Sequence, residues 1–469
     1  SAASDVYKRQ AYYTLLLILY SILYSTSILM ETFFIKALQL ILALALLVMI
    51  HEFGHFLWAR IFKIRVEKFY LFFNPWFSLF KYKPKNSDTE YGIGWLPLGG
   101  YVKIAGMVDE SMDKEQLAKE PAPDEFRVKP AWQRLLVMTG GVLNNFILAI
   151  IIYAGIAWYW GEKTIPYPNA TDGMDFSEQA EKMGFRKGDI ILLADGKPID
   201  EKDRSHLFKM LEAKEITVLR NHRDTVAVAL PDNAIEKLDP EKGFMAYRIP
   251  VYVKTLMPGE PAAKAGVEVD DRIIAIGDSA TPSFSELSQA LYLNGGRETT
   301  VTVLRGNDTI TMAATPTSDG KLGFGLKTPL EVFRCDTTKY GFFQSVPVGV
   351  TNGTDMLVTY VGSLKHLFSK QGAESIGGFG AIGSMFPSKW DWRTFWEMTA
   401  FLSIMLAFMN LLPIPALDGG HVAFLLWEVI TRRKPSDKFL ERAQLAGMLF
   451  LIILLIYANF NDLYRFVLK

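Results

Sequence analysis

Four long apolar stretches dominate the pattern of hydrophobic and polar positions along this chain of 469 residues. They cover approximately residues 33–58, 135–160, 396–430 and 445–460. A helix of about 20 mainly apolar residues crosses the hydrocarbon core of a bilayer. The pattern therefore predicts a polytopic α-helical membrane protein with four transmembrane helices.

The third apolar stretch is interrupted by helix-breaking residues, namely Pro413, Pro415 and the pair Gly419-Gly420. Non-helical backbone at membrane depth occurs only where it is buried in protein or lines a water-filled cavity. We therefore expect this break to border a hydrated pocket inside the helix bundle.

Charge is balanced over the whole chain, with 50 Lys and Arg against 50 Asp and Glu, so we expect no nucleic-acid partner. Basic residues nevertheless gather in the loops that follow the first and third stretches. The positive-inside rule places both loops in the cytoplasm, and both chain ends and residues 161–390 on the opposite side. These basic residues are Arg60, Lys63, Arg65, Lys68, Lys81, Lys83 and Lys85, then Arg432, Arg433, Lys434, Lys438 and Arg442.

The segment before the first stretch does not read as the start of a natural protein, whereas Met30–Lys36 does. We interpret residues 1–29 as a non-native or signal-like N-terminal extension. A further spanning helix over residues 12–30 is the alternative.

An internal repeat lies within residues 161–390. Residues 183–192 align with 265–274, and residues 216–220 align with 301–305. Each copy has a Gly-marked turn, a short buried strand, a helical stretch and then alternating β residues. The repeat predicts two small mixed α/β domains between the second and third transmembrane helices.

The signature around Asp189 and Asp271 in these copies resembles that of tandem PDZ domains. Such domains bind extended peptides as an added strand and often capture a terminal carboxylate. The resemblance implies that the last strand of each copy binds the peptide. That strand comprises Gly323, Phe324, Gly325 and Leu326 in the second copy and residues 243–245 in the first; PDZ-shaped spacers without a ligand are the alternative.

The most informative motif is His51-Glu52-x-x-His55, at the end of the first apolar stretch. Two histidines four residues apart share one helical face and can hold one zinc ion, while the glutamate can act as a general base. Each ionisable residue in a spanning helix costs about 2.5–3.5 kcal/mol, so the cluster points to a function. Two structural histidines at a helix end are the alternative.

A catalytic zinc site needs a third protein ligand. The single Cys335 excludes a cysteine-based site, so histidine or a carboxylate must supply this ligand. Asp418 is the favoured candidate because it is an acidic group at the break in the third stretch. The other histidines are His206, His222, His366 and His421.

His51-Glu52-x-x-His55, Leu417-Asp418-Gly419 and the PDZ pair, in this order, resemble the site-2 protease family of intramembrane zinc metalloproteases, and in particular its RseP-type bacterial members. The likeness covers residues 30–469. It implies that His51, His55 and Asp418 bind Zn²⁺ and that Glu52 is the general base.

Further family motifs imply substrate-binding residues. Asn410 begins the Asn-x-x-Pro-x-Pro-x-Leu-Asp-Gly pattern, which includes Pro413 and Pro415. Gly140 to Phe146 resembles a glycine–asparagine motif, in which either Asn144 or Asn145 could matter and in which packing is the alternative role; we select Asn145.

Residues 94–103, including Gly99, Gly100 and Tyr101, resemble the family's membrane-associated β element. An open strand edge there would bind a substrate whose helix has unwound; an ordinary hairpin is the alternative. Residues 377–383 and the apolar, helix-like residues 346–368 are interpreted as an interfacial element or gate.

The resemblance implies a protease that cuts single-pass membrane proteins, such as an anti-sigma factor, in or near the spanning helix. We expect a location in the bacterial inner membrane, in contact with the lipid bilayer, with the PDZ domains in the periplasm. Clearance of signal-peptide remnants and a catalytically silent PDZ scaffold are alternatives. The expected domains are 1–29 (extension), 30–160 (helices 1 and 2 with the β element), 161–245 (PDZ 1), 246–330 (PDZ 2), 331–393 (gate) and 394–469 (helices 3 and 4).

Overall fold

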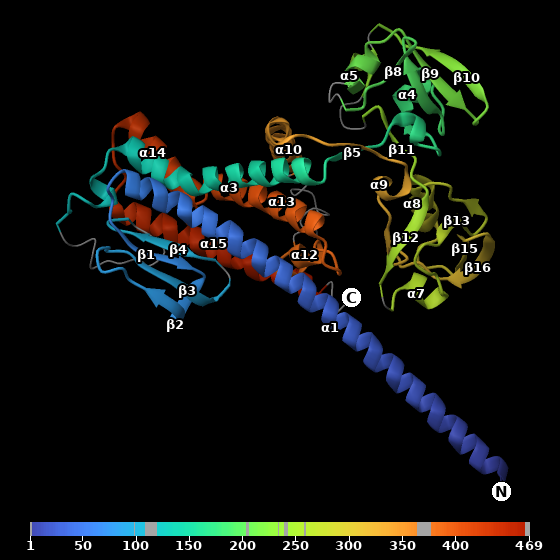
Figure 1. Cartoon of the computed structure of the whole chain (residues 1–469), viewed down its shortest axis with the longest axis horizontal. Helices are drawn as coiled ribbons and strands as arrows, with labels where there is room; N and C mark the ends of the chain where they lie inside the picture. The colour runs from blue at the N-terminus through green and yellow to red at the C-terminus, as the bar shows by residue number, and fades with distance from the viewer. Residues whose placement is uncertain are drawn as a thin grey trace. The chain divides into compact units, whose positions relative to one another are not determined.

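The computed structural model describes residues 2–97, 99–107, 120–202, 206–232, 234–238, 243–257, 259–363 and 377–464, with side chains from residue 30 onward except at 235, 236 and 437. The chain divides into two compact units, each visible in Figure 1. The helical unit contains the residues up to Trp160 and those from Lys339 onward, and the insert contains Gly161–Thr338.

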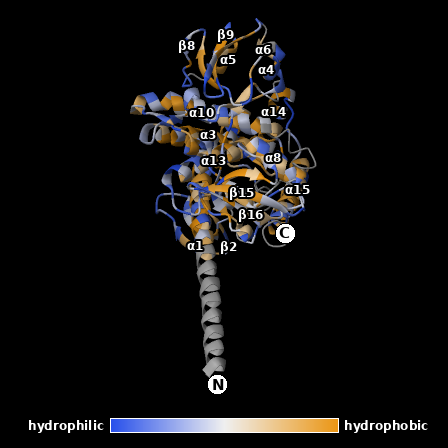
Figure 2. Ribbon diagram, turned by 90° about the vertical axis from the view of Figure 1, so that its right-hand side faces the viewer, coloured by the Kyte–Doolittle hydropathy of each residue, from blue (hydrophilic) through white to orange (hydrophobic). Residues whose placement is uncertain are grey.

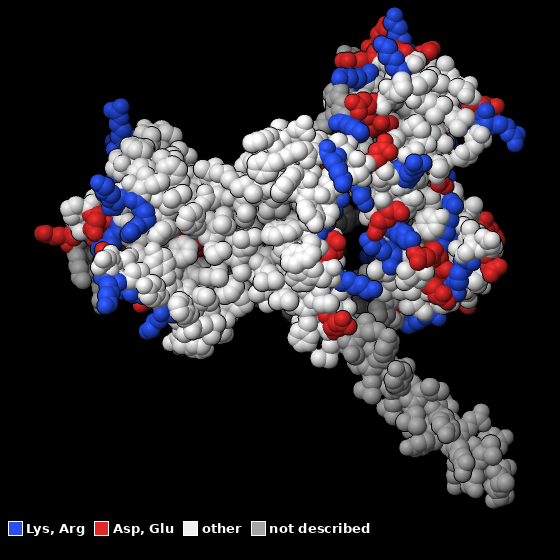
Figure 3. Space-filling model, in the orientation of Figure 1, with Lys and Arg blue, Asp and Glu red and all other residues white. Residues whose placement is uncertain are grey.

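Four described helical segments are long and apolar enough to cross a membrane, which confirms the predicted fold class. They are Met30–Ile61, Ala131–Tyr159, Trp392–Leu411 and Lys438–Leu463. Figure 3 shows a broad uncharged belt over the helical unit, with Lys and Arg gathered at the end that carries α14. The helices are α1 (Ala2–Ile61), α3 (Ala131–Tyr159), α10 (Phe342–Ser363), α12 (Phe379–Ser384), α13 (Trp392–Leu411), α14 (Asp418–Thr431) and α15 (Asp437–Leu463), with a 3-10 turn η1 (Phe126–Val128).

Helix α3 packs against α1, α10 and α13 and forms the centre of the unit. Ala149 and Ile152 of α3 pack with Ala400 and Ile404 of α13. On another side of α3, Gly349 of α10 comes so close that an added Cβ would lie 2.6 Å from the Ile150 carbonyl oxygen. Small residues at both contacts let the helices approach closely, as is typical of packing between membrane helices.

The expected helix over residues 346–368 is α10, whose described part ends at Ser363. His366 and residues 364–376 lie outside the described residues. The Gly-rich segment then continues into α12, where Asp462 of α15 accepts hydrogen bonds from the amides of Gly378 and Ala381. Its role as a gate stays a prediction.

A four-stranded sheet follows α1 in the helical unit, with the strand order β2-β3-β1-β4. β1 runs parallel to β3 and antiparallel to β4, so β4 is an edge strand. The expected β element at residues 94–103 therefore contains the end of β3, the connection between the strands and all of β4 except Ile104; Leu98 lies outside the described residues. The strands are β1 (Val66–Leu71), β2 (Phe73–Tyr82), β3 (Glu90–Leu96) and β4 (Tyr101–Ile104).

The insert contains two successive β-rich domains, as the internal repeat predicts. Figure 2 shows the hydrophobic colouring of their central strands, which form the two cores. The first domain has η2 (Tyr167–Asn169), β6 (Met174–Phe176), α4 (Glu178–Lys182), β7 (Ile190–Ala194), β8 (Lys197–Pro198), α5 (His206–Leu211), β9 (Glu215–Arg220), β10 (Asp224–Ala229), α6 (Ala234–Lys237) and β11 (Met245–Tyr247). The second has β12 (Val251–Leu256), α7 (Pro261–Ala265), β13 (Arg272–Ile276), β14 (Ser279–Ala280), α8 (Phe284–Leu293), β15 (Thr299–Arg305), β16 (Asp308–Ala314) and β17 (Phe324–Leu326).

The two domains differ in where the last strand pairs. β17 joins the main sheet of the second domain through β12, and the strand order is β16-β15-β13-β12-β17. In the first domain β11 pairs with β6 and not with the main sheet, whose order is β10-β9-β7-β8. Beyond the second domain, α9 (Pro329–Val332) leads to β18 (Asp336–Thr338), which pairs antiparallel with β5 (Glu162–Thr164) at the start of the insert.

The repeated Asp and Arg residues form the same clamp in both domains. Asp189 accepts hydrogen bonds from Arg220 at 2.7 and 2.9 Å, and Arg220 also donates to the Gly184 carbonyl. Asp271 and Arg305 make the equivalent bonds at 2.8 Å, with Arg305 donating to Gly266. These signature residues therefore brace the Gly-marked turn against the strand behind it.

Replacing Asp271 with Asn should lower the unfolding temperature of the second domain by about 5 °C or more at neutral pH, because a charged clamp is lost. Burial alone would raise the pKa of Asp271, but the hydrogen bonds from Arg305 and the Glu268 amide outweigh it, so this pKa lies below the ordinary value. The stabilisation is therefore present above the unfolded-state pKa of about 3.9 and is lost as pH falls through the folded-state pKa. Thermal unfolding at several pH values measures this difference, and a difference that persists unchanged at pH 2 would contradict it.

Candidate metal centre

The helix α1 presents His51 and His55 one turn apart, and their Nε2 atoms lie 3.2 Å from each other. Asp418, the first residue of α14, completes a compact cluster. Its Oδ2 lies 3.1 Å from Nε2 of His51 and 3.3 Å from Nε2 of His55. Both histidines are 7% exposed, so the cluster is enclosed by the bundle. The structure thus brings together the three residues predicted to bind the metal.

The break between α13 and α14 carries Asp418 into the bundle. α13 ends at Leu411 and α14 begins at Asp418. Within the break, Ala416 adopts a left-handed backbone (φ 81°), and its amide donates to Gln444 of α15. Gly447 of α15 accommodates this segment, because an added Cβ there would overlap Pro415. α15 therefore supports the loop that holds Asp418, the third candidate ligand.

The glycines that follow Asp418 are required by the same break. A Cβ at Gly419 would overlap the carbonyl oxygens of Leu411 and Leu412, and a Cβ at Gly420 would lie 2.6 Å from the Ile414 oxygen. Gly419 and Gly420 therefore let the start of α14 fold back tightly onto the chain that precedes it.

A backbone carbonyl orients the ring of His55. Nδ1 of His55 lies 2.8 Å from the carbonyl oxygen of Val137 in α3, to which it donates. The proton is then on Nδ1, so Nε2 carries its lone pair toward Asp418. Such a partner for the second ring nitrogen is usual for histidines that bind metals.

Asn145 of α3 serves His51 in the same way. Its side chain is fully buried, and its Nδ2 lies 3.4 Å from Nδ1 of His51 while its Oδ1 has no partner among the described residues. Turning the amide by 180° lets Oδ1 accept the proton of Nδ1 and satisfies both groups. Asn144 is only partly buried, so the structure favours Asn145 among the two candidates.

The cluster has the chemistry and the size of a zinc site. Two imidazole lone pairs and one carboxylate oxygen face each other, and no described residue donates a hydrogen bond to Oδ2 of Asp418. Three such acceptors repel each other unless a cation lies between them. A tetrahedral zinc ion about 2.0 Å from each ligand would separate the ligand atoms by about 3.3 Å, which matches the distances of 3.1–3.3 Å.

Glycines in α3 make room for these rings. An added Cβ at Gly141 would lie 2.6 Å from Cε1 of His51 and 2.6 Å from Nε2 of His55. One position earlier, a Cβ at Gly140 would lie 2.7 Å from the Gly54 carbonyl oxygen of α1. These glycines belong to the glycine–asparagine motif, but this role was not predicted from it. The signal was present, since a Gly pair in a spanning helix indicates close helix packing.

Glu52 faces the same space from α1. It is partly buried and lies close enough to His51, His55 and Asp418 to interact with their charges, and its carboxylate accepts a hydrogen bond from the amide of Val102. Val102 belongs to β4, so the edge strand of the sheet reaches the cluster. Val102 was not predicted as a site residue, because nearly every residue type supplies a backbone amide.

Among the predicted substrate-binding residues, Asn410 lies next to the cluster, with its Nδ2 3.3 Å from Nε2 of His51. Pro413 and Pro415 form the break. Gly99 and Gly100 precede β4, and a Cβ at Gly100 would lie 2.8 Å from Val48 of α1.

Tyr101, the first residue of β4, contacts the sheet and not the cluster. Its ring stacks on Tyr70 at 5.3 Å, and its hydroxyl donates to Asn74. Substrate binding by Tyr101 and the residues before it stays a prediction.

The remaining predicted residues lie elsewhere. His206 contacts Tyr167 in the insert, and His222 lies in a turn after β9. His421 lies on α14, three residues after Asp418. Gly323 directly precedes β17, and Phe324–Leu326 form that strand, whose pairing with β12 leaves the other edge of β17 available to a peptide.

Replacing Gly141 with Ala should displace the histidines and weaken zinc binding about tenfold or more, as expected when metal ligands lose their orientation. The measurement is the zinc content per purified chain in a series of chelator concentrations. Gly155 of α3 is the matched control, because an added Cβ there meets nothing within 4 Å. Equal zinc retention in Gly141→Ala and Gly155→Ala would contradict the packing argument.

Replacing Asn145 with Ala should weaken zinc binding by about 10–100-fold, because His51 loses the partner of its second nitrogen. The neighbouring substitution Asn144→Ala should leave zinc affinity close to that of the parent. Competition with a fluorescent zinc chelator measures both, and an equal effect of the two substitutions would assign the motif to packing.

Comparisons with known proteins agree with this site. The model of Peptidase family M50 matches residues 39–454. The chain is 28% identical over 457 residues to the regulator of sigma E protease of Haemophilus influenzae, covering 91% of this chain and 98% of that protein. It is 27% identical over 456 residues to a predicted zinc metalloprotease of Neisseria meningitidis and 27% identical over 506 residues to one of Thermotoga maritima, again with 91% and 98% coverage.

The family match spans most of the chain and includes Glu52 and all three residues of the cluster. The four apolar helices and the geometry around Nε2 of both histidines point to the same chemistry. We conclude that this multi-pass membrane protein belongs to peptidase family M50 and is an intramembrane zinc metalloprotease.

Proposed function

We propose that this protease cleaves single-pass membrane proteins within or near their transmembrane helix, after another protease has removed the outer domain. The observation that carries the proposal is the enclosed His51–His55–Asp418 cluster within a bundle of apolar helices, next to an edge strand. The enclosed position suits peptide bonds that are presented inside the membrane. The edge strand suits a peptide that has lost its helical hydrogen bonds.

The chain supplies a base and an orienting amide for the reaction. A zinc ion at the cluster would make bound water acidic and polarise the substrate carbonyl. Glu52 accepts the proton of the attacking water and then donates it to the leaving amine. Asn410, 3.3 Å from Nε2 of His51, supports the proposal because its amide can donate to the substrate carbonyl oxygen from the other side of the cluster.

Strand addition to β4 explains how a helical substrate becomes cleavable. A helix keeps its peptide groups bonded internally, so cleavage requires local unwinding, and the freed groups need new partners inside the membrane. Among the described strands β4 has one neighbour, and its Val102 amide points to Glu52. A substrate strand that pairs along this edge passes beside the general base.

The relatives suggest the biological setting. One of them is named regulator of sigma E protease, which supports an anti-sigma factor as the type of substrate. The basic loops support a bacterial inner-membrane location in which α14 ends in the cytoplasm and the insert lies in the periplasm. There the PDZ-like domains admit only shortened substrates, by excluding bulk or by capturing a new C-terminus along β17.

Clearance of signal-peptide remnants uses the same chemistry and is the second candidate. The enclosed cluster favours it equally, because such remnants are also short membrane helices. A silent PDZ scaffold is disfavoured, because it has no use for four ionisable groups inside an apolar bundle.

Co-expression with a tagged, outer-domain-truncated single-pass substrate tests the proposal. Cleavage should occur with the parent and fall about 100–10,000-fold in Glu52→Gln, which removes the base but keeps the side-chain size. Asp418→Ala should also be inactive. Immunoblots of the shortened fragment measure the rate.

Zinc content separates the two inactive variants. Glu52→Gln should retain zinc, whereas Asp418→Ala should lose it. Equal cleavage in parent and variants would overturn the site. A zinc-loaded parent that leaves both an anti-sigma-type substrate and a signal-peptide remnant intact would overturn the proposed substrate class.

A further inference from the structure

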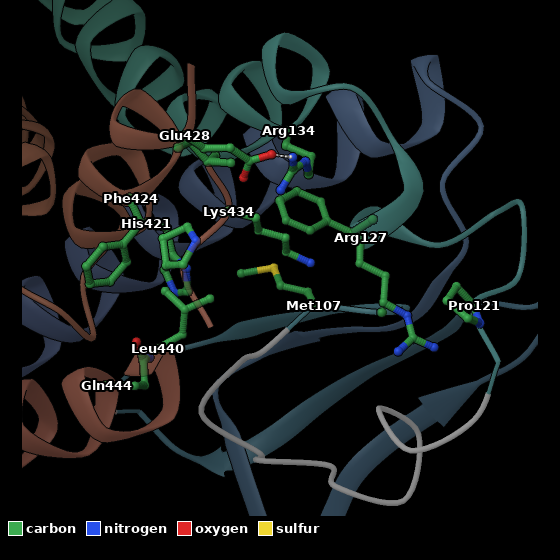
Figure 4. Close-up of a pocket in the computed structure, with 14 residues that line it drawn as sticks. Met107, Pro121, Arg127, Arg134, His421, Phe424, Glu428, Lys434, Leu440 and Gln444 are labelled. Atoms are coloured by element: carbon green, nitrogen blue, oxygen red, sulfur yellow. Dashed lines mark hydrogen bonds and ion pairs between the residues drawn. The ribbon is translucent and has the colours of Figure 1, made fainter. Parts of the chain in front are cut away.

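A pocket of about 250 Å³ lies beyond the metal centre in the helical unit, between α14, the start of α15 and the chain that follows β4 (Figure 4). His421, Phe424, Leu425 and Glu428 form one wall from α14, and these positions recur at helical spacing. The mechanism proposed above does not use this pocket.

The pocket continues the helix face that holds the metal ligand. Asp418, His421, Leu425 and Glu428 share one face of α14, and the distance along the helix from Asp418 to Glu428 is about 15 Å. Glu428 forms an ion pair with Arg134 of α3, with 2.5 Å between its Oε1 and the Nη2 of Arg134. This pair closes the wall at that end. Asp418 and the wall of the pocket therefore lie on the same face of α14.

Two other neighbours of the metal centre extend into the same pocket. Gly106 and Met107 follow β4, whose Val102 amide contacts Glu52. Gln444 lines the pocket and also accepts the amide of Ala416 in the break. The pocket and the metal centre thus share three structural elements.

The exposed apolar side of α14 faces another direction. Its large exposed side chains include Trp427, Val429 and Ile430, with exposed fractions of 58%, 52% and 79%. None of these three residues lines the pocket. This arrangement disfavours a lipid as the occupant and favours a molecule that arrives from the protein interior or from water.

The lining combines positive charge with apolar surface. Arg127, Arg134 and Lys434 are cationic, whereas Glu428 is the one carboxylate among the described lining residues. Arg134 pairs with Glu428, and Arg127 pairs with Glu125 outside the lining.

Lys434 is the lining cation that can form a new ion pair. No described residue forms an ion pair or hydrogen bond with its amine, which points into the pocket beside Met107 in Figure 4. Apolar side chains surround this space, namely Met107, Phe126, Phe424 and Leu440. The chemistry fits an anion attached to an apolar group.

We propose that this pocket binds the C-terminal end of the cleavage product, with the new carboxylate at Lys434 and the last apolar side chain between Met107 and Phe424. This inference rests on the proposed function. Hydrolysis adds water across the peptide bond, so one fragment ends in a carboxylate and the other begins with an amine. The excess of cations in the pocket accepts the carboxylate fragment and disfavours the ammonium fragment.

Binding of a short peptide to the zinc-loaded full-length Glu52→Gln protein tests this proposal without turnover. The probe is a fluorescently labelled six-residue peptide that ends in Ala-Leu-Leu with a free carboxylate, and its partner has the same sequence with a C-terminal amide. The free acid should bind about tenfold or more tightly than the amide, as expected for a charge-assisted contact. Equal binding of the two peptides would overturn the proposal.

Matched substitutions locate the peptide. Lys434→Gln should weaken binding of the free acid about tenfold and leave the amide unchanged, and Lys434→Arg should restore binding because it keeps the charge. Arg433→Gln removes the same charge from the neighbouring residue, which does not line the pocket, and should bind like the parent. An equal loss in Arg433→Gln and Lys434→Gln would show general surface attraction and overturn the site.

Competition separates the product from other anions. Inorganic phosphate that displaces the peptide at equal concentration would identify a general anion site, and vesicles of anionic phospholipid that do so would identify a lipid site; either result overturns the proposal. The proposed function and the proposed peptide site can be overturned independently. Carboxylate-dependent binding without any substrate cleavage would remove the proposed function alone, whereas cleavage with no such binding would remove this inference alone.

Discussion

Three hydrogen-bond acceptors held around one point inside an apolar bundle are the constraint on which the rest of this structure depends. His51 and His55 direct lone pairs at Asp418 within 3.3 Å, an arrangement that is repulsive until a cation neutralises it. The surrounding features hold the three groups in place despite this repulsion. Gly141 leaves space for the rings, and the Val137 carbonyl fixes the tautomer of His55. The break before α14 places the carboxylate of Asp418, the first residue of that helix, beside both rings. The bundle is therefore preorganised for the metal.

Residue chemistry made the candidate metal ligands predictable, whereas much of the rest of the site depends on backbone geometry that the sequence does not show. His51, His55 and Asp418 were predictable because ionisable groups in apolar stretches need a reason. The break was predictable because Pro413 and Pro415 cannot continue a helix. The contact from the Val102 amide to Glu52 was not, since any residue except proline supplies an amide. The pocket beside α14 was also hidden, because its lining comes from segments that are far apart in sequence.

The insert shows that a recurring motif can be structural. The aspartates at 189 and 271 stand out in the repeat and carry its resemblance to PDZ domains, yet each is 1% exposed and holds an arginine of its own domain. They recur because each domain has a Gly-containing turn that is held against a strand by the same aspartate–arginine pair. The two domains diverge at the last strand, for which peptide binding is predicted, because β17 extends the main sheet of its domain and β11 does not.

The pairing of β5 with β18 has a consequence for how this architecture can change over time. Thr164 lies opposite Asp336, so the two chain segments that connect the insert to the helices run side by side. The chain between β5 and β18 therefore begins and ends at the same place on the insert. Domains can be gained, lost or duplicated between β5 and β18 while the order and length of the helices that carry His51 and Asp418 stay the same. The protease core and its inserted domains can therefore evolve as separate modules.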